Sequence, residues 1–214
     1  MSRSQNPTRR RNVGISFGKR ELRDLAVAWV ALSVAFALLT SGPNRFVSLA
    51  PSEMVATLLF TGLTAGIGFL LHELAHKFAA IHFGYPAEFR ADYQMLLLAI
   101  FSAMVGFLFA APGAVYHPKT GPRESGLIAL AGPATNVVLT VVFLPLAFVG
   151  GVVGAIGVYG VFINAFLAGF NMIPYGPLDG RKVLRWSKPG FVVSFAVCGG
   201  LALAALFGPL PTPF

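Results

Sequence analysis

Long apolar runs separated by short polar segments dominate this sequence of 214 residues. With approximate limits, the runs cover residues 25–40, 54–83, 95–111, 127–149, 152–173 and 191–207. Gly and Pro pairs such as Gly42-Pro43 and Pro112-Gly113 interrupt the chain between runs, as expected of breaks between helices. The pattern predicts an all-α fold, a polytopic membrane helical bundle of five or six spans.

The run at about residues 95–111 has two interpretations. If it crosses the membrane, the basic loop at residues 174–188 lies on the side opposite the basic N-terminus. If it is a re-entrant segment, loops 84–94, 114–124 and 174–188 are all cytoplasmic, and the positive-inside rule holds throughout. Non-helical backbone at membrane depth needs cover from protein or a hydrated cavity, so a re-entrant segment is expected beside such a site. The sequence leaves both interpretations open.

Composition and charge support a membrane location. Hydrophobic residues make up 56% of the chain and charged residues 11%, whereas a soluble domain carries about 25% charged residues. The net charge of +8 comes largely from two clusters that adjoin apolar runs, one within residues 3–23 and one within residues 181–188. Such clusters are typical of cytoplasmic anchors in contact with anionic membrane lipid. No nucleic-acid partner is expected, because the chain has no soluble domain to present the charge.

Three ionisable residues, His72, Glu73 and His76, arrive within five positions inside an apolar run (HELAH in single letters). Ionisable groups are expensive in lipid and mark functional sites there. On a helix, His72 and His76 are four positions apart and share a face, so both imidazoles can bind one metal ion. Glu73 is rotated by about 100° from His72. This offset favours contact with a metal-bound water over direct ligation.

A catalytic zinc needs three protein ligands and an open position for water, so two histidines require a partner. Of the eight acidic residues, only Glu73 and Asp179 belong to motifs attached to apolar runs. Asp179 lies in the segment NMIPYGPLDG, residues 171–180, whose two prolines interrupt the helix and let the carboxylate point inward. The alternative for Asp179 is a helix-terminal residue paired with Arg181 or Lys182.

Asn136, in the segment GPATN of residues 132–136, is a polar side chain deep inside its apolar run. An amide donor near a zinc-bound carbonyl would stabilise a developing oxyanion. The alternative is an interhelical hydrogen bond, worth about 1 kcal/mol in a membrane, and the two roles are compatible. Asn171 is expected to brace the loop that carries Asp179.

The HELAH, GPATN and NMIPYGPLDG segments resemble the three signatures of the site-2 protease family of intramembrane zinc metalloproteases. They occur in that family's order and span residues 72–180. The resemblance implies one zinc ion per chain with His72, His76 and Asp179 as ligands and Glu73 as the catalytic base. It also implies that Asn136 contacts the substrate or the oxyanion. Members of this family cut the transmembrane helices of single-span membrane proteins near the cytoplasmic face.

These expectations define a domain plan and an alternative function. Residues 1–20 are expected to form a flexible basic cytoplasmic tail, and residues 21–214 one transmembrane metalloprotease domain with its catalytic core at about 54–186. The expected location is the cell membrane, with a cytoplasmic N-terminus. The alternative is a non-proteolytic zinc-binding membrane protein or a metal transporter. Transport would need polar groups on both sides of the site, and residues 54–71 offer little beyond three threonines.

Overall fold

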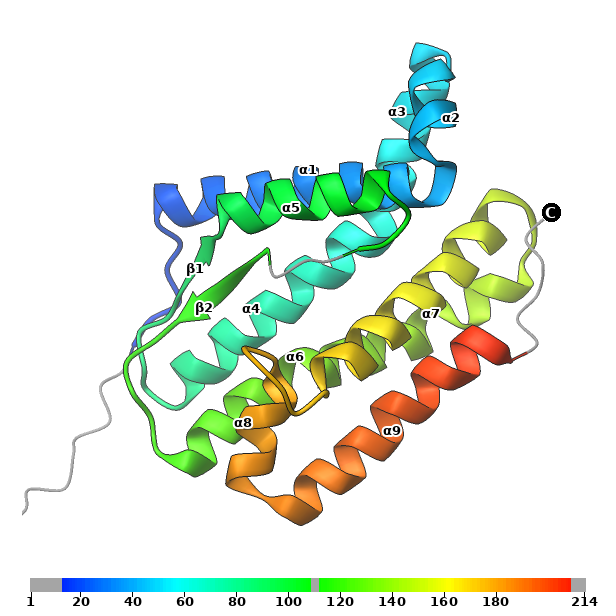
Figure 1. The fold of residues 1–214 in the computed structure, drawn as a ribbon. Helices are drawn as coiled ribbons and strands as arrows, with labels where there is room; N and C mark the ends of the chain where they lie inside the picture. Colours follow the sequence, from blue (N-terminus) through cyan, green and yellow to red (C-terminus); the bar gives the residue numbers. More distant parts are fainter. Residues whose placement is uncertain (1–12, 109–111, 209–214) are drawn as a thin grey trace, which may run out of the picture.

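The structure is a computed structural model that describes residues 13–108 and 112–208 (Figure 1). Within these ranges the regular elements are helices, apart from one pair of short strands. The elements in chain order are α1 (Lys19–Ser41), α2 (Pro43–Ser48), α3 (Pro51–Thr61), the π-helical η1 (Gly62–Gly66), α4 (Ile67–His82), β1 (Glu88–Ala91), α5 (Tyr93–Met104), β2 (Gly113–Tyr116), α6 (Pro122–Phe143), the 3-10 helix η2 (Pro145–Phe148), α7 (Gly151–Asn171), α8 (Asp179–Trp186) and α9 (Lys188–Phe207).

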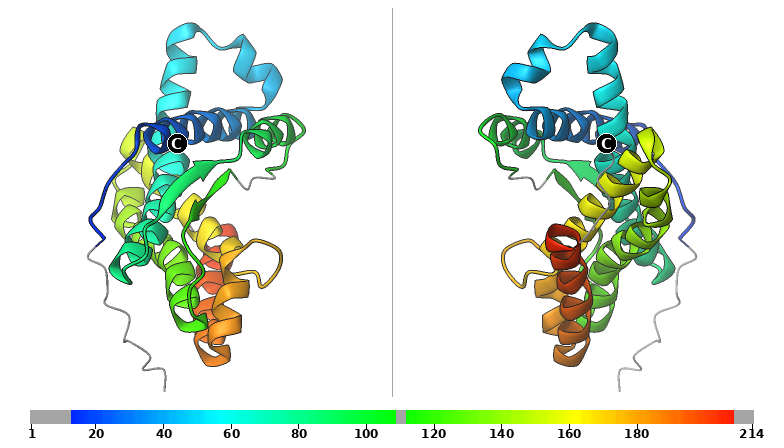
Figure 2. Two further views of the ribbon diagram at one scale, coloured as in Figure 1. Left: turned by 90° about the vertical axis from the view of Figure 1, so that its left-hand side faces the viewer. Right: turned by 90° about the vertical axis from the view of Figure 1, so that its right-hand side faces the viewer.

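The predicted all-α polytopic bundle is confirmed. In the described part of the chain, five helical segments are long and apolar enough to cross a membrane: Lys19–Ser41, Pro51–His82, Pro122–Phe148, Gly151–Asn171 and Lys188–Phe207. Helices α4, α6, α7 and α9 lie side by side in that order, while α1 packs with α5 on the other side of α4 (Figures 1 and 2). The protein is therefore a multi-pass membrane protein.

The apolar run at residues 95–111 does not form a sixth long helix. Its helix, α5, has 12 residues, and residues 109–111 lie outside the described residues. Strands β1 and β2 on either side of the run pair antiparallel, with Ala91 opposite Gly113. The Asp92 N–H donates to the Pro112 carbonyl at 3.0 Å. The chain thus returns to the end of the bundle from which it left, which fits the re-entrant interpretation.

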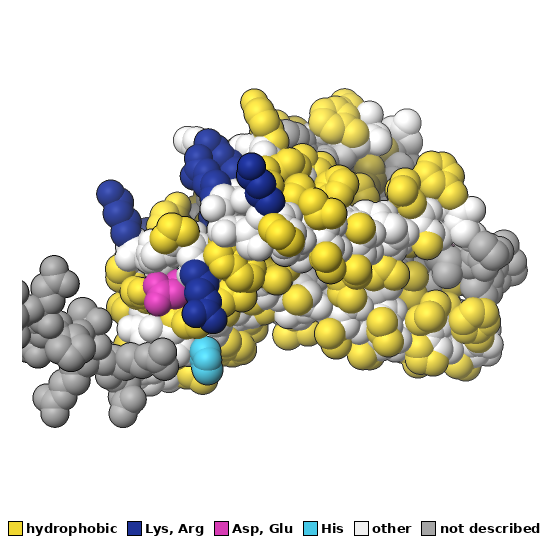
Figure 3. Space-filling view, turned by 90° about the horizontal axis from the view of Figure 1, so that it is seen from below, with side chains coloured by type: hydrophobic (Ala, Val, Ile, Leu, Met, Phe, Trp, Pro, Cys, Tyr) yellow, Lys and Arg dark blue, Asp and Glu magenta, His cyan; other side chains and the backbone are white. Residues whose placement is uncertain are grey.

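The polar segments gather at one end of the bundle. The start of α1, the β1–β2 pair, the start of α6 and α8 all lie toward the left of Figure 1. Figure 3 shows Lys, Arg, acidic and His side chains at this end, while apolar side chains cover the rest of that face. Loops 84–94, 114–124 and 174–188 therefore share one side of the molecule, which we call the polar end.

Helix α4 continues the α3 span through the π-helical turn of η1, where α1 approaches closely. A Cβ added at Gly62 would lie 2.9 Å from the Trp29 ring, and one at Gly66 would lie 2.6 Å from it. The Trp29 indole Nε1–H donates to the Gly62 carbonyl at 3.0 Å. Both glycines thus allow the α1 indole to lie against η1, and this contact fixes α1 beside the site-bearing helix.

The first described residues are attached to α4 through a buried ammonium group. Lys77 has no exposed surface, and its Nζ donates to the Ser16 carbonyl at 2.6 Å and to both Glu21 carboxylate oxygens at 2.6–2.7 Å. The same Nζ lies 3.8 Å from the centre of the Phe17 ring. Glu21 in turn accepts the Phe89 N–H at 3.0 Å. Ser16 and Phe17, within the segment assigned by sequence to a flexible tail, therefore contact α4. Residues 1–12 of that segment lie outside the described residues.

Candidate metal centre

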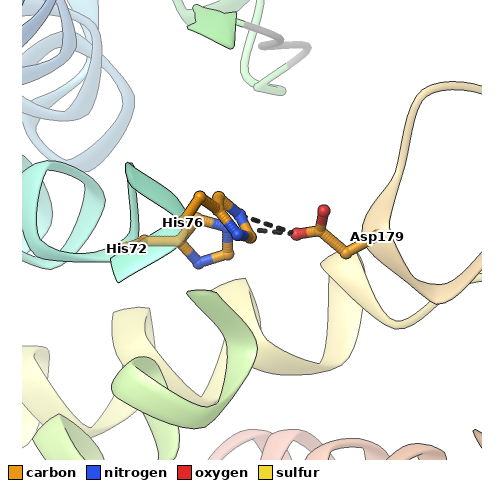
Figure 4. Close-up of side chains that lie close together, drawn as sticks. All are labelled: His72, His76 and Asp179. Atoms are coloured by element: carbon orange, nitrogen blue, oxygen red, sulfur yellow. Dashed lines mark ion pairs between the residues drawn. The ribbon is translucent and has the colours of Figure 1, made fainter. Parts of the chain in front are cut away.

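Two helices bring the three candidate ligands together. His72 and His76 lie one turn apart on α4, and Asp179 is the first residue of α8. One ligand atom from each residue lies within 4.8 Å of the others. The Asp179 Oδ2 is 3.3 Å from His72 Nε2 and 3.1 Å from His76 Nε2 (Figure 4). All three side chains are buried.

These separations fit a zinc ion. Ligand atoms about 2.0–2.1 Å from a tetrahedral zinc lie about 3.3 Å from one another. The two carboxylate–imidazole separations of 3.1 and 3.3 Å agree with that value. Two imidazoles and one carboxylate are also a donor set of catalytic zinc sites, which leave a fourth position open. The structure therefore brings together His72, His76 and Asp179 in an arrangement that could hold one zinc ion.

Hydrogen bonds on the far side of each imidazole orient the rings. His76 Nδ1 lies 2.7 Å from the Ile128 carbonyl oxygen. Because a carbonyl only accepts, this nitrogen must carry the proton, and Nε2 is left with its lone pair toward the site. His72 Nδ1 is hydrogen-bonded to the Asn136 side-chain oxygen. Such outer partners set the tautomer and the ring direction of metal-binding histidines.

Helix α6 approaches the two imidazoles so closely that only glycine fits at the point of contact. A Cβ added at Gly132 would lie 2.5 Å from His72 Nε2 and 2.5 Å from His76 Nε2. Carbon atoms in favourable contact are about 3.5–4.0 Å from their neighbours. Gly132, the first residue of the GPATN segment, therefore leaves the space that a metal ion and its two histidine ligands need.

Glu73 is placed beside this centre without being one of the three converging ligands. It is buried, and its Oε2 has no hydrogen-bond partner among the described residues. An unpaired buried carboxylate oxygen is unfavourable unless a further group binds there. Glu73 lines the same cavity as His72, His76 and Asp179. Its free oxygen is thus available to a water molecule at the centre.

The cavity that contains these side chains has a volume of about 160 Å³. Its walls come from α1, α4, β2, α6, α7 and the segment before α8. Gly113, Ala114 and Val115 of β2 lie on one side, and Phe170 and Asn171 of α7 lie on another. The centre is therefore buried in the bundle and bordered by an extended strand as well as by helices.

Asp179 also has a cationic neighbour, as the sequence alternative proposed. Lys182 Nζ lies 3.7 Å from Asp179 Oδ1, whereas Arg181 donates to the Gly176 carbonyl instead. Burial opposes the charged form of Asp179, but the neighbouring His76 and His72 outweigh it and hold the pKa of this carboxyl below its usual range. The ionised carboxylate can thus face both imidazoles with Oδ2 while Oδ1 faces the lysine.

Asn136 of α6 lies where α4 and α7 meet. It has no exposed surface. Its Nδ2 donates to the Gly68 carbonyl at 3.2 Å and to Asn164 Oδ1 at 2.9 Å, while its Oδ1 faces His72. Both polar atoms of its side chain are therefore hydrogen-bonded to protein groups. The interhelical hydrogen bond, the alternative drawn from sequence, is present.

Two buried residues near the centre escaped the sequence analysis. Asn164 is a fully buried amide in the middle of α7, and Glu21 is the buried partner of Lys77. The signal for Asn164 was an amide in the middle of an uncharged apolar run, the same feature that drew attention to Asn136. Glu21 carried no such signal, because it lies among the basic residues at the start of α1.

Comparisons with known proteins point in the same direction as the geometry. A protein of Methanocaldococcus jannaschii, provisionally named zinc metalloprotease MJ0611, is 40% identical over 177 residues, which cover 80% of this chain and 86% of the relative. Zinc metalloprotease MJ0392 of the same organism is 31% identical over 156 residues, or 67% of this chain and 41% of the relative.

A third relative, from Synechocystis sp. and provisionally named zinc metalloprotease sll0528, is 32% identical over 139 residues, or 62% of this chain and 30% of the relative. No protein-family model and no solved structure matches the chain. The identity to the first relative extends over most of both proteins. The chain therefore belongs to the zinc metalloprotease family of these relatives.

Proposed function

We propose that this protein is an intramembrane zinc metalloprotease of the site-2 protease family. It would hydrolyse peptide bonds within or next to substrate transmembrane helices, near the cytoplasmic face. The observation that carries this proposal is the convergence of His72, His76 and Asp179 beside a buried Glu73 oxygen that has no hydrogen-bond partner among the described residues. The two histidines and Glu73 belong to a helix long and apolar enough to span a membrane. The names of the relatives, all zinc metalloproteases, support the same activity.

In this proposal His72, His76 and Asp179 hold one zinc ion. When bound, zinc polarises a peptide carbonyl and makes water more acidic. Glu73 takes a proton from the attacking water through its free Oε2, and the hydroxyl group adds to the carbonyl carbon. Glu73 then passes the proton to the amide nitrogen as the carbon–nitrogen bond breaks, so that an amine and a carboxylic acid leave.

The position of the centre supports cleavage near one membrane surface. His76 is followed at once by Lys77, whereas residues 54–71 carry no charge. The centre thus lies toward the polar end, where the basic segments gather. Under the positive-inside rule we assign this end, and the N-terminus, to the cytoplasm of a cell membrane. The proposed substrates are single-span membrane proteins, with membrane lipid around the bundle and no nucleic-acid partner.

Transport of a metal ion is the less well supported alternative. A transport path would need polar groups on the far side of the centre, where residues 54–71 supply Thr57, Thr61 and Thr64. The hydroxyl groups of these three threonines all donate to backbone carbonyls at 2.8–2.9 Å. They are therefore already satisfied within the helices and offer little to a passing ion.

The proposal is tested with purified parent protein and the Glu73→Gln variant. Each is analysed for zinc content and for cleavage of an unstructured fluorogenic peptide and of a reconstituted single-span protein. Parent protein should hold about one zinc per chain and cleave, and Glu73→Gln should keep the zinc and lose cleavage. The matched control is Glu53→Gln, an exposed residue on the same span, which should behave like the parent.

Two results would contradict the proposal. Cleavage by Glu73→Gln at the parent rate would remove Glu73 from the mechanism. Parent protein that holds zinc but cleaves neither substrate would favour the non-proteolytic alternative.

A further inference from the structure

Two fully buried amides, Asn136 of α6 and Asn164 of α7, form a hydrogen-bonded pair behind His72. The Asn136 Nδ2 donates to Asn164 Oδ1 at 2.9 Å, and neither side chain has exposed surface. Buried polar side chains in a membrane bundle are retained where they have a function or a partner. Asn136 is hydrogen-bonded to His72 directly, whereas the hydrogen bonds of Asn164 go to Asn136 and to the Gly160 carbonyl. Its contribution to the centre must therefore pass through Asn136.

Backbone carbonyls define the direction of both amides. The Gly160 carbonyl accepts from Asn164 Nδ2 at 2.8 Å, so the Asn164 oxygen faces away from its own helix. The Gly68 carbonyl accepts from Asn136 Nδ2 at 3.2 Å. A carbonyl oxygen cannot donate, so neither amide can exchange its nitrogen and oxygen without placing two acceptors together. The chain of hydrogen bonds thus has a single direction from α7 to α4.

The direction of this chain determines the protonation pattern of His72. With both hydrogens of its Nδ2 used by Gly68 and Asn164, Asn136 presents only its Oδ1 to His72 Nδ1. His72 Nδ1 must then carry the hydrogen, which leaves the lone pair on Nε2 for a metal ion. Asn164 Oδ1 accepts the second of the two Asn136 Nδ2 hydrogens. Its distance from Nδ2, 2.9 Å, is shorter than the 3.2 Å between Nδ2 and the Gly68 carbonyl oxygen.

The α4 helix leaves room for Asn164 by means of a glycine. A Cβ added at Gly68 would lie 2.7 Å from Asn164 Oδ1 and 3.3–3.4 Å from the other atoms of its amide group. Gly68 is one turn before His72 on α4. The same residue therefore supplies the carbonyl for Asn136 and the space for Asn164, so both amides meet the helix at one point.

We propose that Asn164 is a positioning residue for the metal centre. It orients the Asn136 amide, and through it holds His72 in the tautomer and ring direction that bind a metal ion. This inference rests on the metal centre of the proposed function, and it gives α7 a role in that centre besides lining its cavity. Removal of an outer-shell partner of a metal-binding histidine lowers metal affinity by about 10–100-fold. Because Asn164 acts through a second amide, we expect a loss of about tenfold.

The experiment compares four variants of the full chain in detergent. Asn164→Leu removes the amide, and Asn164→Ser leaves a hydroxyl too short to reach Asn136. Asn164→Asp keeps an oxygen that can accept from Asn136, and its protonated form can also donate to the Gly160 carbonyl as the Asn164 amide does, so it should rescue the centre. Thr61→Val is the control, because Thr61 is equally buried and donates to the Ser33 carbonyl away from the centre.

Three properties are measured for each variant. The first is the zinc dissociation constant, obtained by competition with a chelator. The second is the visible absorption spectrum after substitution with Co²⁺, which reports ligand geometry. The third is the melting temperature of the metal-free protein, which reports the fold alone.

Asn164→Leu and Asn164→Ser should lose about tenfold in zinc affinity and shift the Co²⁺ spectrum. Asn164→Asp should stay within about threefold of the parent, and Thr61→Val should keep the parent affinity and spectrum. If Asn164→Leu does not fold, Asn164→Ser decides the question in the same assay.

The inference is overturned if both removing variants keep the parent zinc affinity and Co²⁺ spectrum. It is equally overturned if Asn164→Asp keeps the melting temperature of the parent but loses as much zinc affinity as Asn164→Leu, because the acceptor oxygen would then be irrelevant. These measurements do not depend on proteolysis. A parent protein that binds zinc but cleaves nothing contradicts the proposed function and still tests Asn164, whereas a parent that binds no zinc contradicts both.

Discussion

Replacing Gly132 by alanine should remove zinc from the centre without unfolding the protein. The new methyl carbon would lie 2.5 Å from the Nε2 atoms of both His72 and His76, about 1 Å closer than a favourable contact. Either the imidazoles turn away or α6 moves back. Both responses displace nitrogen atoms that must stay about 2.0–2.1 Å from a zinc ion.

The size of the effect follows from the number of ligands affected. Four-ligand zinc sites in small peptides bind with about 10–16 kcal/mol, or roughly 2.5–4 kcal/mol per ligand. Loss of one histidine from the coordination sphere should therefore weaken zinc binding by about 60-fold or more, because 1.4 kcal/mol corresponds to tenfold. Alanine is favoured over glycine in a helix by about 0.8–1.0 kcal/mol. The helix itself should thus tolerate the change.

Zinc affinity is measured by chelator competition, and folding by the melting temperature of the metal-free protein. The matched control is Gly154→Ala in α7, where the added Cβ would meet only the Ala147 carbonyl at an ordinary 3.7 Å. That variant should keep the parent zinc affinity and melt at the same or a slightly higher temperature. A Gly132→Ala protein whose zinc affinity stays within about threefold of the parent would refute the steric reasoning and the location of the metal.

Three further predictions concern the third ligand, the buried ion pair and the topology. Asp179→Ala should lower zinc affinity by about 60-fold or more by the same per-ligand reasoning, and retention of zinc would move the third ligand elsewhere. Lys77→Met should destabilise the protein by about 3–5 kcal/mol in chemical unfolding, because the Glu21 carboxylate is left buried and unpaired. The double variant with Glu21→Leu should recover part of that loss, and no recovery would argue against the pair. In a background without the native cysteine, cysteines at positions Lys119 and Lys188 should both be protected from an impermeant reagent added outside intact cells. Labelling at Lys119 alone would contradict a shared cytoplasmic side.

Local properties of the chain were enough to predict the helices and the arrangement of the centre's residues on α4. Each membrane-spanning helix is visible as an apolar run, because transfer of its side chains into lipid depends on composition and length. His72 and His76 share a face because helical spacing alone puts residues four apart on one side. The offset of Glu73 follows from the same geometry, and the prolines around Asp179 marked where a helix had to break.

The sequence by itself therefore determined which segments are helices and which residues can bind a metal, while the tertiary structure decided which of them meet. Asp179 reaches the two α4 histidines because α8 begins beside them. The Asn136 oxygen faces His72 because Asn164 and Gly68 accept the hydrogens of the Asn136 amide nitrogen. After the short α5 the chain returns to the polar end, because β2 pairs with β1. In a membrane helix nearly every face is apolar, so periodicity does not reveal which faces pack together. Those partners depend on the whole bundle, where close approach and the pairing of buried polar groups select one arrangement.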